Sequence, residues 1–206
     1  GAYQTEYAGG LYDFFIGKFN DDGTMKWATY FGGEDKETCE GIGVDHNNNI
    51  VLVGNSQSDG IATPGAFKTE ITGPSGDALI AKFNPNGSLM WSTYYGGDSA
   101  ENARSIVFDN DNYLYFGGVS GSHFGIATEG TYQDSMKGIE DAWLAKFTPQ
   151  GNRVWGTYLG DSGLDRAHVV TIDLFGRAYL AGTTSSKNGF ATPGAHQPVY
   201  GGGKEG

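Results

Sequence analysis

Three acidic side chains recur at a fixed spacing and could bind a ligand or a cation. Glu37, Glu101 and Asp165 are separated by 64 residues. Carboxylate oxygens are hard ligands that suit Ca²⁺, and they also accept hydrogen bonds from polar ligands. A second acidic residue precedes each of the three. We therefore predict six candidate ligand- or cation-binding positions: Glu37, Glu101, Asp165, Asp35, Asp98 and Asp161. The alternative is that these side chains cap turns or solvate loops.

Other chemistry-bearing patterns are weaker. The run 109–112 (Asp-Asn-Asp-Asn) resembles the start of a calcium loop, but no central glycine or closing glutamate follows, so a hairpin turn is the better interpretation. The four histidines lack metal-ligand spacing. No Gly-x-Ser-x-Gly elbow occurs, and the glycine-rich stretches lack the lysine of a phosphate loop. We predict no catalytic residue, no metal centre and no cofactor, with calcium the one ion kept open. Acidic residues are plentiful enough that a carboxylate pair for glycoside cleavage is not excluded.

An internal repeat explains the recurrence of these residues. The segment 13–19 returns at 77–83 and at 141–147, a step of 64 residues each time, with the pattern Asp-x-x-x-x-Lys-Phe. Trp27, Trp91 and Trp155 share the same step. Long periods of this kind indicate solenoids, propellers or arrays, in which one structural unit is stacked on the next.

Each period contains four strand-like runs. In the first full period these are residues 41–44, 50–54, 77–83 and 88–95, with Asn-, Asp- and Gly-rich turns after the first and third. The third run is apolar on both faces, as expected for a sheet that lies between two neighbours. We therefore predict an all-β fold of four-stranded antiparallel blades, about three of them, from a β-propeller whose closed ring has six to eight blades. The expected order is a half blade (13–33), two blades (38–97 and 102–161) and another half blade (166–184), with the native protein continuing at both ends.

Strand polarity predicts which connections share a face. The two short hairpins of a blade lie on one side, whereas the long loop (56–76) and the inter-blade loops lie on the other. Long loops on a rigid scaffold are common places for binding sites. We place Glu37, Glu101 and Asp165 in the inter-blade loops, where they would ring that face.

The remaining repeat positions are expected to be structural. Trp27, Trp91 and Trp155 follow a Gly-x-x-x-Trp spacing similar to the tryptophan-docking motif of quinoprotein propellers, and we predict that they pack between blades. A pyrroloquinoline quinone dehydrogenase would also need a metal and a basic clamp, which the sequence does not display. Cys39 shares its position with two alanines and is expected to fill a small buried site.

Composition narrows the possible partners. The chain has 206 residues, 35 of them glycine, and a formal net charge of −11. A negative surface argues against nucleic-acid binding, which needs a basic stripe. No apolar run is long enough to span a membrane, so direct membrane insertion is not expected. The single cysteine excludes an internal disulfide.

The segments 77–87, 63–67, 105–109 and 113–118 resemble SBBP-type β-propeller repeats, and the resemblance covers essentially the whole chain. It implies a secreted or surface-exposed bacterial protein. In Bacteroidetes-like bacteria such repeats often occur in type IX secretion substrates, some of them gliding-motility-associated. The family implies no shared catalytic residues.

These observations favour a non-enzymatic function. The first hypothesis is an extracellular or cell-surface binding or structural module, whose partner is another surface or outer-membrane protein, a polysaccharide, or the rest of its own propeller. The second is a propeller hydrolase or lyase that acts on glycans or peptides through loop carboxylates. A quinoprotein-like oxidoreductase is a third.

Overall fold

The computed structural model describes residues 2–202, and within them it contains twelve β-strands and no helix. The strands are β1 (Phe14–Phe19), β2 (Met25–Phe31), β3 (Glu37–Val44), β4 (Ile50–Ser56), β5 (Asp77–Phe83), β6 (Leu89–Tyr95), β7 (Glu101–Phe108), β8 (Leu114–Ser120), β9 (Asp141–Phe147), β10 (Arg153–Leu159), β11 (Asp165–Ile172) and β12 (Ala178–Thr184).

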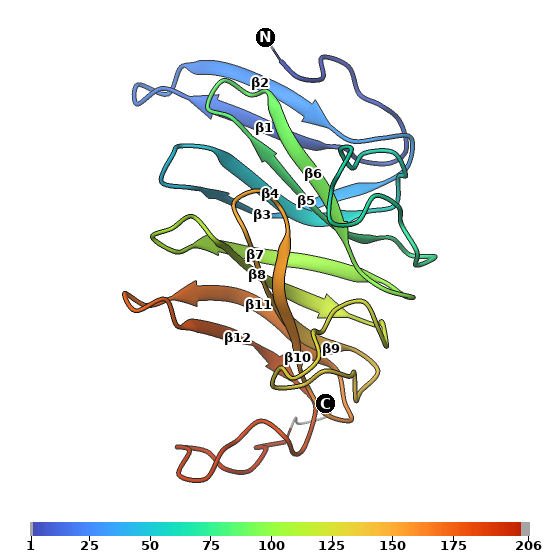
Figure 1. Cartoon of the computed structure of the whole chain (residues 1–206), viewed down its shortest axis with the longest axis vertical. Helices are drawn as coiled ribbons and strands as arrows, with labels where there is room; N and C mark the ends of the chain where they lie inside the picture. The colour runs from blue at the N-terminus through green and yellow to red at the C-terminus, as the bar shows by residue number, and fades with distance from the viewer. Residues whose placement is uncertain (1, 203–206) are drawn as a thin grey trace.

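The strands form four antiparallel sheets in chain order. Two sheets have four strands, β3-β4-β5-β6 and β7-β8-β9-β10, and two have two strands, β1-β2 and β11-β12. The sheets are stacked along the long axis of the molecule (Figure 1). The predicted all-β fold of four-stranded antiparallel blades is therefore confirmed, and we call the sheets blades below. The described residues do not close a ring.

Short turns set the register within each blade. Asp45 accepts hydrogen bonds from the backbone of the hairpin that it begins, and Asn48 adopts a left-handed backbone with φ of 63°. Asn112 does the same in the next blade, with φ of 62°. Asparagine tolerates this conformation better than other residues with side chains, so the sequence of the turn fixes the pairing of the strands on either side.

Apolar residues fill the spaces between blades. All seven residues of β5 are buried. Its two faces belong to two clusters: Leu79 and Phe83 pack toward β1 and β2, whereas Ile80 packs toward β7 and β9. A blade in the middle of the stack thus buries both faces.

The first strands of successive blades lie side by side. β3 contacts β7, and β7 contacts β11. The Oγ of Ser105 on β7 accepts a hydrogen bond from the backbone N–H of Val170 on β11, at 3.0 Å. The blades therefore converge at their first strands, as blades do around a propeller axis.

Two sequence expectations need correction. The first strand is longer than predicted and begins at Glu37, which pairs with Ser56. A bulge in each first strand breaks the alternating pattern, so the residues before it do not read as strand. Cys39 is exposed rather than buried. At the same repeat position Ala103 and Ala167 are buried by the preceding blade's first strand, and in the described residues no such strand precedes β3.

Candidate functional site

The three carboxylates that we predicted to line the long-loop face are buried beneath its surface. Glu37, Glu101 and Asp165 each begin the first strand of a blade, and each is at most 1% exposed. Their oxygens accept hydrogen bonds from a hydroxyl on the second strand and from a backbone N–H of the preceding loop: Ser56 and Gly33, Ser120 and Gly97, Thr184 and Asp161. The structure thus gives these side chains a role in holding each inter-blade loop. Ligand binding by them stays a prediction.

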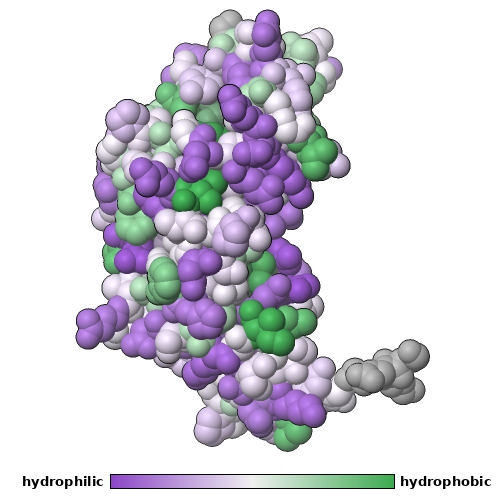
Figure 2. All heavy atoms as spheres, turned by 90° about the vertical axis from the view of Figure 1, so that its right-hand side faces the viewer, coloured by the Kyte–Doolittle hydropathy of each residue, from purple (hydrophilic) through white to green (hydrophobic). Residues whose placement is uncertain are grey.

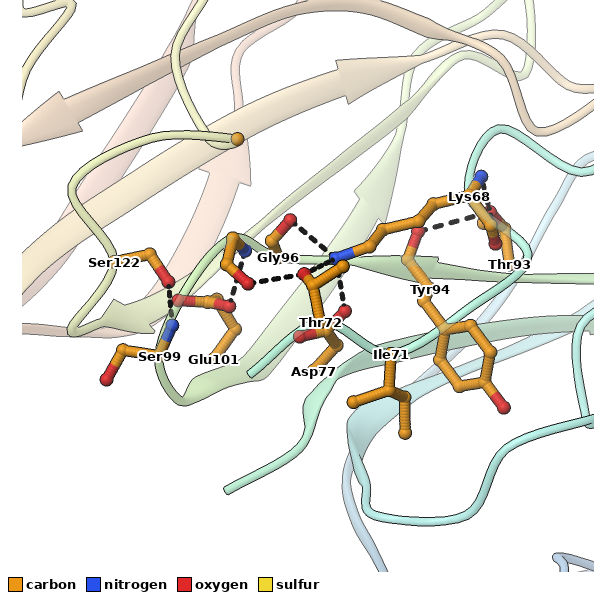
Figure 3. A network of polar contacts seen from close by, with 12 residues as sticks. Lys68, Ile71, Thr72, Asp77, Thr93, Tyr94, Gly96, Ser99, Glu101 and Ser122 are labelled. Carbon is orange, nitrogen blue, oxygen red and sulfur yellow. Dashed lines mark hydrogen bonds and ion pairs between the residues drawn. The ribbon is translucent and has the colours of Figure 1, made fainter. Parts of the chain in front are cut away.

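A second carboxylate accompanies each of them; Asp77 and Asp141 are buried, and Asp13 is partly buried. The first residue of the third strand, Asp77 in the first whole blade, lies beside Glu101 of the next blade across Gly96 (Figure 3). A Cβ at Gly96 would collide with the Glu101 carboxylate and lie 2.7 Å from Oδ1 of Asp77. The same arrangement joins Asp13 to Glu37 across Gly32. Paired carboxylates therefore recur at blade junctions.

Only one of these pairs has a lysine partner. Lys68 on the long loop forms an ion pair with Asp77 and also donates to the carbonyl oxygen of Gly96 at 2.8 Å (Figure 3). Gln4 and Gln133 take the corresponding place in the other blades and donate to Asp13 and Asp141. Oδ1 of Asp77 is nevertheless buried without a hydrogen-bond partner.

Burial changes the proton affinity of these acids. The pKa of Glu101 is raised to about 7, and desolvation by burial is the largest cause. The nearby charge of Asp77 also raises this pKa, whereas hydrogen bonds from Ser122, Ser120 and Gly97 lower it. Desolvation also raises the pKa of Asp77, although Lys68 lowers it. One acid of the pair is therefore protonated over part of the neutral range.

We expect the stability of the protein to fall as the pH rises through this range. Because the folded-state pKa of Glu101 is above its ordinary value of 4.5, the native state binds more protons than the unfolded chain between the two values, and the stabilisation is lost toward pH 7. The expected loss is about 2 kcal/mol between pH 5 and pH 7. Urea denaturation across this range measures it.

The Glu101→Gln variant isolates this effect. Its side chain does not titrate, so the variant should show a flatter dependence of unfolding free energy on pH between pH 5 and pH 7. Glu129→Gln makes the same chemical change on an exposed loop residue and should retain the wild-type slope. An unchanged slope in Glu101→Gln would contradict the assignment.

The second acidic residue of each inter-blade loop is closer to solvent. Asp35 and Asp98 are exposed and Asp161 is half-buried. Asp98 accepts a hydrogen bond from the backbone N–H of His123 at 2.9 Å, and this bond lowers its pKa most. Their predicted role in ligand binding remains a prediction.

A polar groove lies on the same side, where two inter-blade junctions meet the long loops. Its volume is about 390 Å³. Lys36, Gln57, Ser99, Asn102 and Glu140 supply polar groups to its lining, with Ile139 as an apolar neighbour. Figure 2 shows this side of the molecule as largely hydrophilic, with small and separate hydrophobic patches. Such a surface suits a polar partner better than an apolar one.

Sequence reasoning missed a row of ionisable residues beside this groove. Each first strand has its β-bulge at one repeat position, and the extra residue is Glu40, Arg104 or His168. Arg104 Nη1 lies 2.7 Å from His168 Nδ1 across neighbouring blades. Bulges re-aim side chains and are frequent next to functional sites. The 64-residue spacing of three ionisable residues could have revealed the row, but the bulge itself is not visible in the sequence.

The opposite side of the blades has a tryptophan contact between neighbours. The indole N–H groups of Trp27 and Trp91 donate to the carbonyl oxygens of Pro85 and Pro149, in the β5-β6 and β9-β10 hairpins of the next blade, at 3.3 and 3.1 Å. A glycine lies under each ring: a Cβ at Gly151 would be 3.1 Å from the Trp91 indole. Trp155 contacts Tyr115 of its own blade. Trp27 and Trp91 therefore contact the next blade, whereas packing of Trp155 between blades stays a prediction.

No metal site is evident in residues 2–202. Among them, no group of three His, Cys, Asp or Glu side chains is placed to hold a metal ion. Asp109, which begins the calcium-like run, accepts from the backbone of Asp111 and Tyr113 and pairs with Lys146. Its oxygens are engaged in the hairpin turn. Calcium binding stays a prediction.

Comparison with known proteins finds similar repeats in two parts of the chain. A family model described as "Beta-propeller repeat" (SBBP) matches residues 26–62 and 154–190, each time from the fourth strand of one blade through the first two strands of the next. Both segments are similar to SBBP β-propeller repeats. An uncharacterized WD repeat-containing protein of Acanthamoeba polyphaga mimivirus is 22% identical over 199 residues. That match covers 83% of this propeller chain, and the chain spans 14% of the viral protein.

Within the described part of the propeller chain, no helix is long and apolar enough to cross a membrane.

Proposed function

We propose that these repeats form a protein-binding module of a β-propeller, and that the polar groove on the long-loop side is its contact surface. The observation that carries the proposal is the use of the acidic residues. Glu37, Glu101 and Asp165 recur once per blade and are engaged by hydroxyls and loop N–H groups. Because these carboxylates are engaged in this way at each described junction, we assign them to the support of the blades. We assign recognition to the other polar residues of the groove, whose lining also includes Glu101.

The groove supplies the polar contacts that recognition needs. Lys36 and Glu140 bring both signs of charge to its lining, and Asn102 and Gln57 bring amides. Residues from neighbouring blades contribute together, so binding would depend on the assembled propeller. The propeller repeats and the WD-repeat relative support protein interaction in general.

The hydrolase or lyase hypothesis has less support. The carboxylates do converge in pairs, but the pairs are buried beneath loops and recur at blade junctions. A catalytic pair needs room for its substrate between the two groups. We therefore assign the pairs to structure.

We also propose an extracellular or bacterial cell-surface location, with a surface protein as the partner. This rests on the resemblance to secreted SBBP proteins. Fractionation of the source cells, with protease accessibility of the intact protein, tests it. Full protection of the protein in intact cells would overturn it.

Site-specific photo-crosslinking in the intact parent protein tests the contact surface. A photoreactive side chain at Gln57 or Asn102 should crosslink one and the same partner in its native source. The same side chain at Met25, exposed on β2, is the control and should not. Equal crosslinking from all three positions would contradict the proposal.

A further inference from the structure

Arg104 differs from the other arginines of the chain in what it contacts. Arg153, Arg166 and Arg177 each donate to an oxygen of the protein. Arg104 has one hydrogen-bonding contact among residues 2–202, to the imidazole of His168, and takes part in none of the ion pairs among these residues. Its Nε is buried without a partner. The fold therefore leaves most of the donors of one guanidinium unused.

The position of Arg104 in the fold makes these unused donors informative. Arg104 is the extra residue at the bulge of β7, and β7 contacts both β3 and β11. The blades on either side of Arg104 are thus both present, and neither offers it a carboxylate. A bulge re-aims the side chain that it carries. The bulge of β7 therefore presents a cation at the edge where the first strands converge.

His168 holds the guanidinium without neutralising it. Nη1 of Arg104 lies 2.7 Å from Nδ1 of His168. An arginine nitrogen only donates, so Nδ1 is the acceptor and the ring carries its hydrogen on Nε2. Nε2 lies 3.2 Å from the hydroxyl oxygen of Thr183. The imidazole is therefore neutral in this arrangement, and it orients Arg104 while the positive charge stays available.

We propose that Arg104 binds a carboxylate group of a peptide, with Nη1 and Nη2 as the two donors and with His168 as a positioning residue. Nη1 keeps a second hydrogen beside the one that faces His168, and Nη2 donates to no residue of the described chain. Two parallel N–H groups match the two oxygens of a carboxylate. The proposal goes beyond the proposed function and does not depend on it, because Arg104 and His168 lie outside the lining of the polar groove.

Charge favours a carboxylate over a phosphate group or a nucleic acid. One guanidinium compensates one negative charge, whereas a polyanion needs a row of cations. Glu40 takes the equivalent place on β3, and the formal net charge of the chain is −11. A ligand with several negative charges would be repelled by this surface. A single carboxylate is therefore the ligand that fits best.

Ligand-observed saturation-transfer NMR with the intact parent protein tests the site. The first probe is a glycine peptide with one central glutamate and both ends blocked, and its control has glutamine in that place. The second probe is a blocked-amine glycine peptide with a free C-terminal carboxylate. Binding of the first probe alone identifies an acidic side chain as the ligand, and binding of the second alone identifies a C-terminus. Both results support the proposal, whereas equal binding of the glutamate and glutamine peptides, without binding of the second probe, would overturn it.

Variants of Arg104 assign the binding to this residue. Arg104→Gln should weaken binding of the carboxylate probe about tenfold, as expected when a charge-assisted hydrogen-bonded pair is lost. Arg177→Gln removes the same charge at the β11-β12 hairpin and should leave the affinity within about twofold. Arg104→Lys keeps the charge but not the paired donors, so its affinity should lie between those of wild type and Arg104→Gln. Wild-type affinity in both Arg104 variants would contradict the assignment.

Variants of His168 separate positioning from charge. His168→Ala removes the acceptor of Arg104 and should weaken binding, whereas His168→Gln keeps a side-chain acceptor and should restore most of the affinity. A role of the imidazole in direct ligand binding would instead make both variants equally weak, and would overturn its assignment as a positioning residue.

Glu40→Gln provides a test with the opposite sign. Oε1 of Glu40 lies 3.4 Å from Nδ2 of Asn102, and Glu40 forms no ion pair with Arg104. Removal of this negative charge from the neighbouring first strand should strengthen binding of the carboxylate probe, because like charges repel. Weaker binding in Glu40→Gln would contradict the proposed site.

Discussion

The Gly96→Ala variant is expected to lose about 3 kcal/mol of unfolding free energy. The added methyl group would meet the Glu101 carboxylate and the Asp77 carboxylate, both held by hydrogen bonds in a buried junction. Neither acid can move away without breaking those bonds and leaving a buried polar atom unsatisfied. Urea denaturation of wild type and variant at one pH measures the loss.

Gly17→Ala is the matched control. It makes the same change in the third strand of the half blade, where Ala81 and Ala145 occupy the equivalent positions and a Cβ would meet only the ring of Phe19. Its unfolding free energy should stay within about 1 kcal/mol of wild type. If both variants lose the same amount, crowding of the carboxylate junction is not the cause.

Trp91→Ala is expected to cost about 3 kcal/mol. The change removes an indole that fills the space over Gly151, and it leaves the carbonyl oxygen of Pro149 without its donor. Trp155→Ala should cost only about 1 kcal/mol, because Trp155 contacts its own blade and no hairpin of a following blade in the described residues. Denaturation midpoints of the two variants measure the difference.

Equal losses from the two tryptophans would show that packing within a blade, and not the contact with the next hairpin, determines their contribution. Trp91→Phe separates the two parts of the effect. It keeps an aromatic ring near Gly151 but removes the N–H donor and part of the indole volume, so its loss of unfolding free energy should lie between those of wild type and Trp91→Ala, at about 1 to 2 kcal/mol.

The amino-acid sequence by itself determined the repeat, the strands and their turns. Residues 77–83 read as a strand buried on both faces, and all of them are buried in β5. Asn48 and Asn112 mark tight turns, and both adopt the left-handed backbone that such turns need. These features were predictable because strand period and turn conformation are local properties of the chain.

Only the tertiary structure determined that the acidic residues are buried and paired at blade junctions. Glu101 and Asp77 lie 24 residues apart on different blades, and blade packing brings both to Gly96. Their burial therefore depends on contacts between sheets, which no local pattern encodes. The row of Glu40, Arg104 and His168 also escaped prediction, because a β-bulge is defined by pairing with a second strand. Charge and spacing in the sequence identified residues of interest, and non-local packing determined whether they face solvent or support the fold.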